Sequence, residues 1–128
     1  MTGPPGLVGL HHVQVAAPRG SEEVLRRFYG GVLGMTEVPK PPDLAGRGGV
    51  WFRSGGVELH LGVEDDFRPA GKAHPGLLVA DLPAYVERLA AHGVLVEWDR
   101  DNAFPGYRRC YLQDPHGNRL ELLEPLPA

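Results

Sequence analysis

The sequence predicts an α+β protein made of two tandem units, each with the element order strand, helix and then three strands. Alternating apolar residues indicate short strands, and each half holds one helical stretch near its start. The second half also repeats the order of the first at a distance of about sixty positions. One such unit leaves an apolar sheet face bare, so two units, or two chains, are expected to pack together. The matched positions are His12 with His74, Gly34 with Gly93, Gly56 with Gly117 and His60 with Glu121.

The first unit is predicted to span about residues 9–64. A strand at residues 11–15 leads through a polar turn to Ser21, which is expected to cap a helix that runs to about Tyr29. Gly30, Gly31 and Gly34 end that helix, and a short strand at residues 35–38 follows. A loop rich in Pro and Gly, residues 39–49, then leads into a hairpin with strands at 50–53 and 57–61.

The second unit is predicted to span about residues 72–125. A strand at residues 74–79 is followed by Asp81, which is expected to cap a helix over residues 82–92 that stops at Gly93. Strands at 94–98, 107–112 and 119–123 complete the unit, the last two joined by a turn at residues 114–118. The two units together make residues 1–128 a single domain, which is an ordinary domain size.

Composition narrows the class of protein. The chain has 128 residues, a net charge of -3 and 13 scattered Lys and Arg residues, which argues against a nucleic-acid partner. No apolar run is long enough to cross a membrane, and the first ten residues lack the pattern of a secretory signal, so we expect a cytoplasmic protein. Cys110 is alone and cannot form an internal disulfide. A small molecule is the expected partner.

The repeated positions also predict a metal site. Side chains alternate along a strand, so Glu58 and His60 should share one side of the sheet, with Glu121 on the same side of the last strand. His12 and His74 begin the first strand of each unit. Three imidazoles and one carboxylate suit a divalent transition metal such as Zn, Ni, Co, Mn or Fe. The predicted ligands are therefore His12, His60, His74 and Glu121.

Four segments carry a resemblance to a known family: HHV at the start, FYGGVLGM, GGVELHL and DPHGNRLELLEP. Together they resemble the vicinal oxygen chelate superfamily of glyoxalases, bleomycin resistance proteins and extradiol dioxygenases. The resemblance implies a cup-shaped, partly open eight-stranded sheet formed by the paired modules, a homodimer, and metal ligands at the four positions above. Glyoxalases often carry Glu where this chain has Glu58 or His60. Aligning Gly56 with Gly117 favours His60 as the ligand and leaves Glu58 beside it as an acid or base.

The same resemblance implies a glyoxalase-like lyase or isomerase acting on a small α-oxygenated carbonyl compound. The metal would act as a Lewis acid toward an enediolate-like intermediate, and Glu121 or Glu58 would move the proton. Two alternatives stay open: a non-catalytic protein that binds an antibiotic or another small molecule, and an Fe(II) ring-cleaving dioxygenase.

Aromatic and basic residues on the strands that floor the cup are the candidate substrate contacts. Some of these rings are expected to line the pocket and others to join the core. Arg108 and Arg109 are adjacent, so only one of them can face inward, where a guanidinium could bind a substrate carboxylate. The predicted substrate-binding residues are Trp51, Phe52, Tyr107, Arg109 and Tyr111.

Overall fold

The eight strands form two four-stranded sheets. The computed structural model describes residues 3–101 and 103–127. The strand orders are β1-β4-β3-β2 and β5-β8-β7-β6, and in each sheet the first strand pairs in parallel with the last while the other pairs are antiparallel. The elements are β1 (Val13–Pro18), α1 (Glu22–Leu25), η1 (Arg26–Val32), β2 (Thr36–Val38), α2 (Pro42–Ala45), β3 (Val50–Ser54), β4 (Val57–Glu64), β5 (Gly76–Leu78), α3 (Leu82–Ala91), β6 (Glu97–Trp98), β7 (Tyr107–Gln113) and β8 (Arg119–Pro125).

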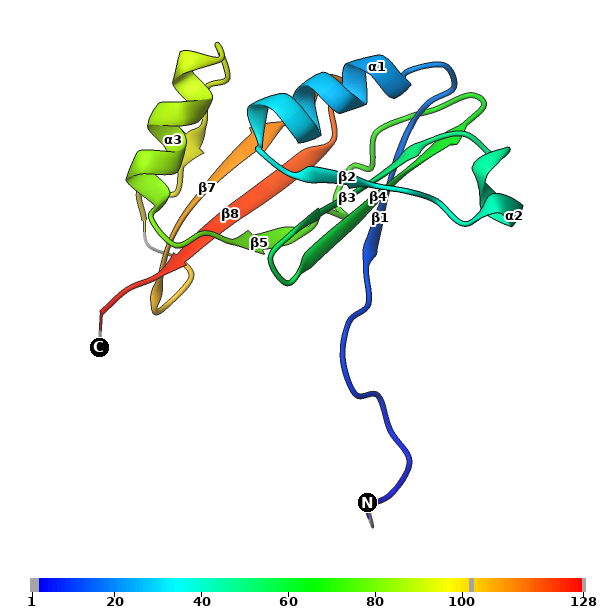
Figure 1. Ribbon diagram of the computed structural model, residues 1–128. Helices are drawn as coiled ribbons and strands as arrows, with labels where there is room; N and C mark the ends of the chain where they lie inside the picture. The colour runs from blue at the N-terminus through cyan, green and yellow to red at the C-terminus, as the bar shows by residue number, and fades with distance from the viewer. Residues whose placement is uncertain (1–2, 102, 128) are drawn as a thin grey trace.

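This arrangement confirms the predicted α+β class and the repeated element order. The sheets are not closed, and their strands hydrogen-bond within two separate sheets rather than in one sheet of eight. Helices α1 and α3 lie on one side of the sheets, α2 lies beside the first sheet, and residues 3–12 run away from the other side (Figure 1). That second side, opposite α1 and α3, is called the open face below.

One apolar core joins the two units on the helix side. It contains Leu25 and Tyr29 from the first helix, Leu59 from β4, Leu89 from α3 and Leu122 from β8, all almost fully buried. Burial of this kind stabilises a fold by about 25 cal/mol for each Å² of apolar surface removed from water. The helix faces of the two sheets are therefore packed, and the open face is free to carry polar groups.

Several local predictions need correction. The strand expected to begin at residue 11 begins at Val13, and the strand expected from residue 74 begins at Gly76, so His11, His12 and His74 precede their strands. The strand expected over 94–98 is reduced to Glu97–Trp98. The loop at 39–49 holds a short helix, Pro42–Ala45, that Pro42 can start because its fixed backbone angle suits the first helical turn.

The first helix changes character along its length. After α1 the chain continues as a π-helix, in which Leu33 donates to the carbonyl of Phe28 at 2.9 Å. Ser21 lies before the helix but makes no capping bond, because its hydroxyl donates to the Pro18 carbonyl instead. In the second unit the predicted cap is confirmed, since Asp81 accepts from the Ala84 amide at 3.1 Å, and Gly93 follows the helix with φ of 79°.

Candidate metal centre

His12 and His60 form the first half of the candidate site, at the start of β1 and in the middle of β4. Their rings stack with centroids 3.9 Å apart, and Trp51 stacks on the other face of His60 at 3.8 Å. The three rings therefore make one column on the open face. His60 is only 3% exposed although it lies on the open face, because the column covers it. His11 contacts His12 through the two Nδ1 atoms, 2.9 Å apart.

Glu58 lies beside this column. Its carboxylate is 2.8 Å from His60 Nε2 and also accepts from the Arg53 guanidinium. The hydrogen bonds with His60 and Arg53 lower the pKa of Glu58 to about 2. Partial desolvation, with the neighbouring rings of His60 and His11 as further causes, lowers the pKa of His12. A lowered pKa keeps the His12 imidazole neutral near pH 7, which is the form that binds metals.

His74 and Glu121 form the second half, just before β5 and in β8. His74 Nε2 lies 2.7 Å from Glu121 Oε1, and His74 Nδ1 lies 2.9 Å from the Lys72 carbonyl. The other oxygen of Glu121 accepts from Arg109 Nη1 at 3.0 Å, and Arg109 also donates to Asp99 at 2.8 Å. Glu121 is 7% exposed, so this network fixes the direction of a nearly buried carboxylate.

The donor atoms of this second pair suit a metal ion. Neighbouring ligands held about 2.1 Å from a tetrahedral Zn²⁺ are themselves roughly 3.4 Å apart. His74 Nε2 and Glu121 Oε1, at 2.7 Å, instead share a hydrogen bond and would have to separate slightly to admit an ion. A contact to a carbonyl through the other ring nitrogen, as His74 makes with Lys72, is the usual support for a ligand histidine. The second pair therefore offers a nitrogen and an oxygen ligand, each with a supporting contact, whereas the first pair consists of two stacked imidazoles.

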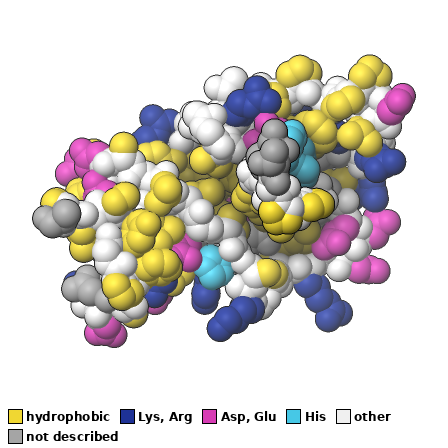
Figure 2. Space-filling model, turned by 90° about the horizontal axis from the view of Figure 1, so that it is seen from below, with side chains coloured by type: hydrophobic (Ala, Val, Ile, Leu, Met, Phe, Trp, Pro, Cys, Tyr) yellow, Lys and Arg dark blue, Asp and Glu magenta, His cyan; other side chains and the backbone are white. Residues whose placement is uncertain are grey.

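The four predicted ligands are brought together as two pairs. Across residues 3–101 and 103–127, no three His, Cys, Asp or Glu side chains are placed so that they could hold one metal ion. Figure 2 looks onto the open face, and the histidines visible there lie in two separate places. His12 and His74 do border one shared hollow of about 430 Å³ between the two sheets. Within the described residues of one chain the four predicted ligands therefore fall into two pairs, and their convergence on one metal ion stays a prediction.

The predicted substrate contacts divide between the two faces. Tyr111 and Arg109 lie on the open face with Glu121, and Tyr107 shares their alternation and contacts Phe104 with ring centroids 5.1 Å apart. Arg108 points to the other side, 4.0 Å from Glu124. The prediction that Phe52 contacts the substrate is wrong. Its side chain is 1% exposed in the helix-side core, with ring centroids 5.7 Å from Tyr29, and therefore cannot line the open face.

Sequence reasoning missed two features of this face. Asp99, which holds Arg109, lies just beyond β6, where the sequence predicts only a loop. Arg119 is predicted only as the first residue of a strand, although its guanidinium lies over the ring of Tyr111, 5.3 Å from the centroid. The alternation of Arg119 with buried leucines along β8 places it on this face, but no local pattern predicts the contacts of Arg119 or Asp99.

Comparison with known proteins agrees with this fold. A family model described as the Glyoxalase/Bleomycin resistance protein/Dioxygenase superfamily matches residues 9–122. No curated protein matches the chain. A crystal structure of a protein from Bacillus anthracis assigned to the glyoxalase family is similar, with 45% identity, a TM-score of 0.91, and coverage of 96% of this chain and 99% of the other.

Two more distant structures share the fold. One is an antibiotic-binding protein from Streptomyces sp. CB03234, with 24% identity, a TM-score of 0.69, and coverage of 94% of this chain and 100% of the other. The second is a variant of a fosfomycin resistance protein from Listeria monocytogenes, complexed with Mn(II) and 1S,2S-dihydroxypropylphosphonic acid. It has 18% identity and a TM-score of 0.69, and the match covers 91% of this chain and 90% of that one. From the family match over most of its length, this chain belongs to the Glyoxalase/Bleomycin resistance protein/Dioxygenase superfamily.

Proposed function

We propose that this protein is a metal-dependent, glyoxalase-like lyase or isomerase that acts on a small α-oxygenated carbonyl compound. The observation that carries the proposal is the His74–Glu121 pair, whose nitrogen and oxygen face each other at 2.7 Å with Arg109 behind them. His12 and His60 occupy the equivalent positions of the other unit. Three imidazoles and one carboxylate form a set that Zn, Ni, Co, Mn or Fe accepts.

Each metal centre in this proposal is built from two chains. One chain supplies His12 and His60, and a second copy supplies His74 and Glu121. The separation of the two pairs in one chain supports this assembly, because neither pair alone provides the three or four protein ligands that such metals normally take. A homodimer would then hold two equivalent centres, as its two-fold symmetry requires.

The residues around the pairs have definite roles in this scheme. When bound, the metal would supply positive charge next to two neighbouring substrate oxygens and so stabilise the anion left after proton removal. Arg109 fixes the Glu121 carboxylate, and Glu58 holds His60 through Nε2. Glu121 and Glu58 are the carboxylates on this face that can take up the substrate proton. Trp51, Tyr107 and Tyr111 provide apolar surface beside them.

Metal analysis and turnover test the proposal. Purified protein loaded with each candidate metal should bind about one equivalent per chain and convert an α-hydroxycarbonyl substrate. His74→Ala and Glu121→Ala should each lower metal affinity by at least tenfold, because losing a ligand removes a direct metal contact. The matched control is His92→Ala, at the exposed end of α3, which should bind metal normally. The proposal is contradicted if wild-type protein binds less than about a tenth of an equivalent of each metal per chain and shows no turnover.

A complementation experiment tests assembly from two chains. One variant carries His12→Ala and His60→Ala, and the other carries His74→Ala and Glu121→Ala. Neither should bind metal tightly alone. After refolding together, half of the dimers are mixed and each regains one of two centres, so about a quarter of the wild-type metal content should return. No recovery, despite mixed dimers seen by native mass spectrometry, would show that centres form within one chain.

A second candidate function is sequestration of a small molecule without chemistry. It is favoured by the column of His12, His60 and Trp51 rings, a flat aromatic surface suited to a planar ligand. His60, His74 and Glu121 also already have hydrogen-bond partners within the chain. Bleomycin affinity measured by fluorescence separates the two functions. If the free energy of bleomycin binding by the His74→Ala/Glu121→Ala variant stays within about 1 kcal/mol of the wild-type value, sequestration is favoured.

A further inference from the structure

Arg119 is a positive group on the open face that no carboxylate neutralises. In the part of the chain that is described, it makes no ion pair and no side-chain hydrogen bond, and it is exposed. The neighbouring guanidiniums differ. Arg109 is held by Asp99 and Glu121, and Arg53 is held by Glu58. The donors of Arg119 are therefore free to bind a ligand; among the described residues Arg68, which borders the same pocket as Arg119 and His74, makes no ion pair either.

The position of the Arg119 guanidinium points it toward the metal pair. Its strand partner is Gln113, but its guanidinium lies over the ring of Tyr111, whose own strand partner is Glu121. The side chain thus leans along the sheet toward Glu121. Stacking on a ring uses the flat face of a guanidinium and leaves the N–H groups around its edge available for a bidentate contact with an oxyanion.

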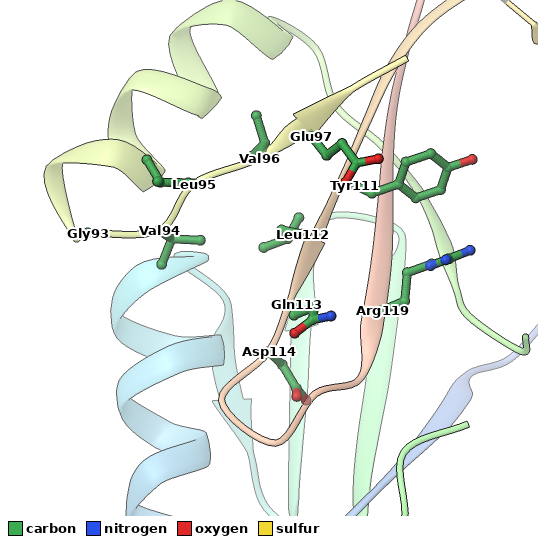
Figure 3. A pocket seen from close by; sticks show the side chains of 10 residues that line it. All are labelled: Gly93, Val94, Leu95, Val96, Glu97, Tyr111, Leu112, Gln113, Asp114 and Arg119. Atoms are coloured by element: carbon green, nitrogen blue, oxygen red, sulfur yellow. The ribbon is translucent and has the colours of Figure 1, made fainter. Parts of the chain in front are cut away.

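A hollow lies beside this guanidinium. A pocket of about 720 Å³ is bordered by Glu97, Tyr111, Gln113 and Arg119, and Figure 3 shows the Tyr111 and Arg119 side chains pointing the same way from β7 and β8. Arg119 also borders a second pocket, of about 420 Å³, which includes His74. Glu97 is the register partner of Tyr111 on β6, but among the described residues it forms no ion pair with Arg119.

We propose that Arg119 forms an anion subsite and that the substrate carries an oxyacid group, such as a carboxylate or phosphonate, in addition to its vicinal oxygens. The backbones of residues two apart on a strand are about 7 Å apart, and the Arg119 guanidinium leans toward Glu121, so the anionic group lies within about that distance of the Glu121 end of the site. This inference rests on the proposed function for the position of the vicinal oxygens. It also reassigns the substrate carboxylate from Arg109, which is already engaged, to Arg119.

Paired chelators that differ only in charge test the subsite. Propionohydroxamate presents two vicinal oxygens to a metal, and succinomonohydroxamate presents the same oxygens with an added carboxylate. Mn(II)-loaded wild type should bind the charged probe about tenfold more tightly by calorimetry, a difference of about 1.4 kcal/mol. Arg119→Gln should lose this preference while keeping wild-type affinity for Mn(II). Arg108→Gln, on the opposite face, is the matched control and should keep the preference.

The outcomes separate the subsite from the metal function. A preference that survives in Arg119→Gln, or that is absent from wild type, overturns the subsite while leaving metal binding intact. If wild type does not bind Mn(II) but binds another candidate metal, the two chelators are measured with that metal. If it binds none of them, the proposed function fails, and the subsite is then tested on metal-free protein with phenylphosphonate. In that case Arg119→Gln should bind phenylphosphonate about tenfold more weakly than Arg108→Gln. This difference in affinity should grow as the salt concentration is lowered, because less salt screens the charges less. Equal phenylphosphonate affinities of Arg119→Gln and Arg108→Gln overturn the proposed anion subsite.

Discussion

Gly49, just before β3, illustrates how single residues shape this fold. Its φ is 86°, and a Cβ at this position would lie 2.1 Å from the carbonyl oxygen of Leu61. That close approach lets the loop enter β3 beside β4. The sequence shows only a glycine-rich connector here, and nothing in its pattern tells Gly49 from Gly46.

Substitution of these two glycines should have opposite effects. Gly49→Ala combines a backbone clash with an unfavourable φ, and should lower the free energy of unfolding by roughly 3 kcal/mol or prevent folding. Gly46→Ala is the control, because Gly46 has φ of -73° and open space around it. It should be neutral or stabilising by about 0.5 kcal/mol. Urea unfolding of both variants measures the difference, and Gly49→Ala within 0.5 kcal/mol of wild type would contradict this reading.

The first helix shows how elements are tied to loops. Glu22 in its first turn accepts a hydrogen bond from the Gly49 amide at 2.8 Å. That bond joins α1 to the segment before β3 and satisfies an amide that cannot join the sheet ladder. The backbone hydrogen bond from Gly49 lowers the pKa of Glu22 below its ordinary value.

The Glu22 contact should give a pH-dependent contribution to stability. A carboxyl whose folded pKa lies below its unfolded value of 4.5 stabilises the fold above that value, and this contribution is lost as the pH falls through the folded pKa. Glu22→Gln should therefore be less stable than wild type by about 1 kcal/mol at pH 7. The difference should shrink below pH 4.5 in urea unfolding. Glu23→Gln, at an exposed neighbour, serves as control, and a pH-independent difference for Glu22→Gln would refute the argument.

Two tyrosines link the units across the whole molecule. The Tyr29 hydroxyl donates to the buried Asp114 carboxylate at 2.7 Å, and the Tyr85 hydroxyl donates to the Leu33 carbonyl at 2.7 Å. Asp114 also accepts from Asn118, whose amide donates to the Ala16 carbonyl in β1. Burial, together with the negative charge of Asp114, raises the pKa of Tyr29, so its hydroxyl stays protonated as the donor.

Removing the two hydroxyls should therefore have unequal costs. Tyr29→Phe leaves a buried carboxylate short of one donor and should lower the free energy of unfolding by about 2 kcal/mol, against about 1 kcal/mol for Tyr85→Phe, whose partner is a neutral carbonyl. Thermal or urea unfolding measures both. In a double-mutant cycle with Asp114→Asn, the coupling energy with Tyr29→Phe should exceed 0.5 kcal/mol. Equal costs for both variants, without coupling, would contradict this account.

The parts of the fold that the sequence predicts are those that follow from local strand periodicity. Period-two alternation in residues 57–61 and 119–123 correctly separated the buried leucines from His60 and Glu121, because alternation follows from strand geometry alone. Strand ends and short elements were less predictable. Glu97–Trp98 is brief because its length depends on pairing with β7, which is a long-range contact.

The sequence by itself determined the duplicated strand–helix–strand order and the chemical types at the repeated positions, since these depend on local periodicity and spacing. Only the tertiary structure decided how the predicted ligands are grouped. It places His12 with His60 and His74 with Glu121, because His12 and His74 lie just before β1 and β5, which pair with the strands that carry His60 and Glu121. It also decided which arginine is free, since Arg109 meets Asp99 and Glu121 only after three strands align. Contacts between distant segments depend on packing, and no local pattern encodes them.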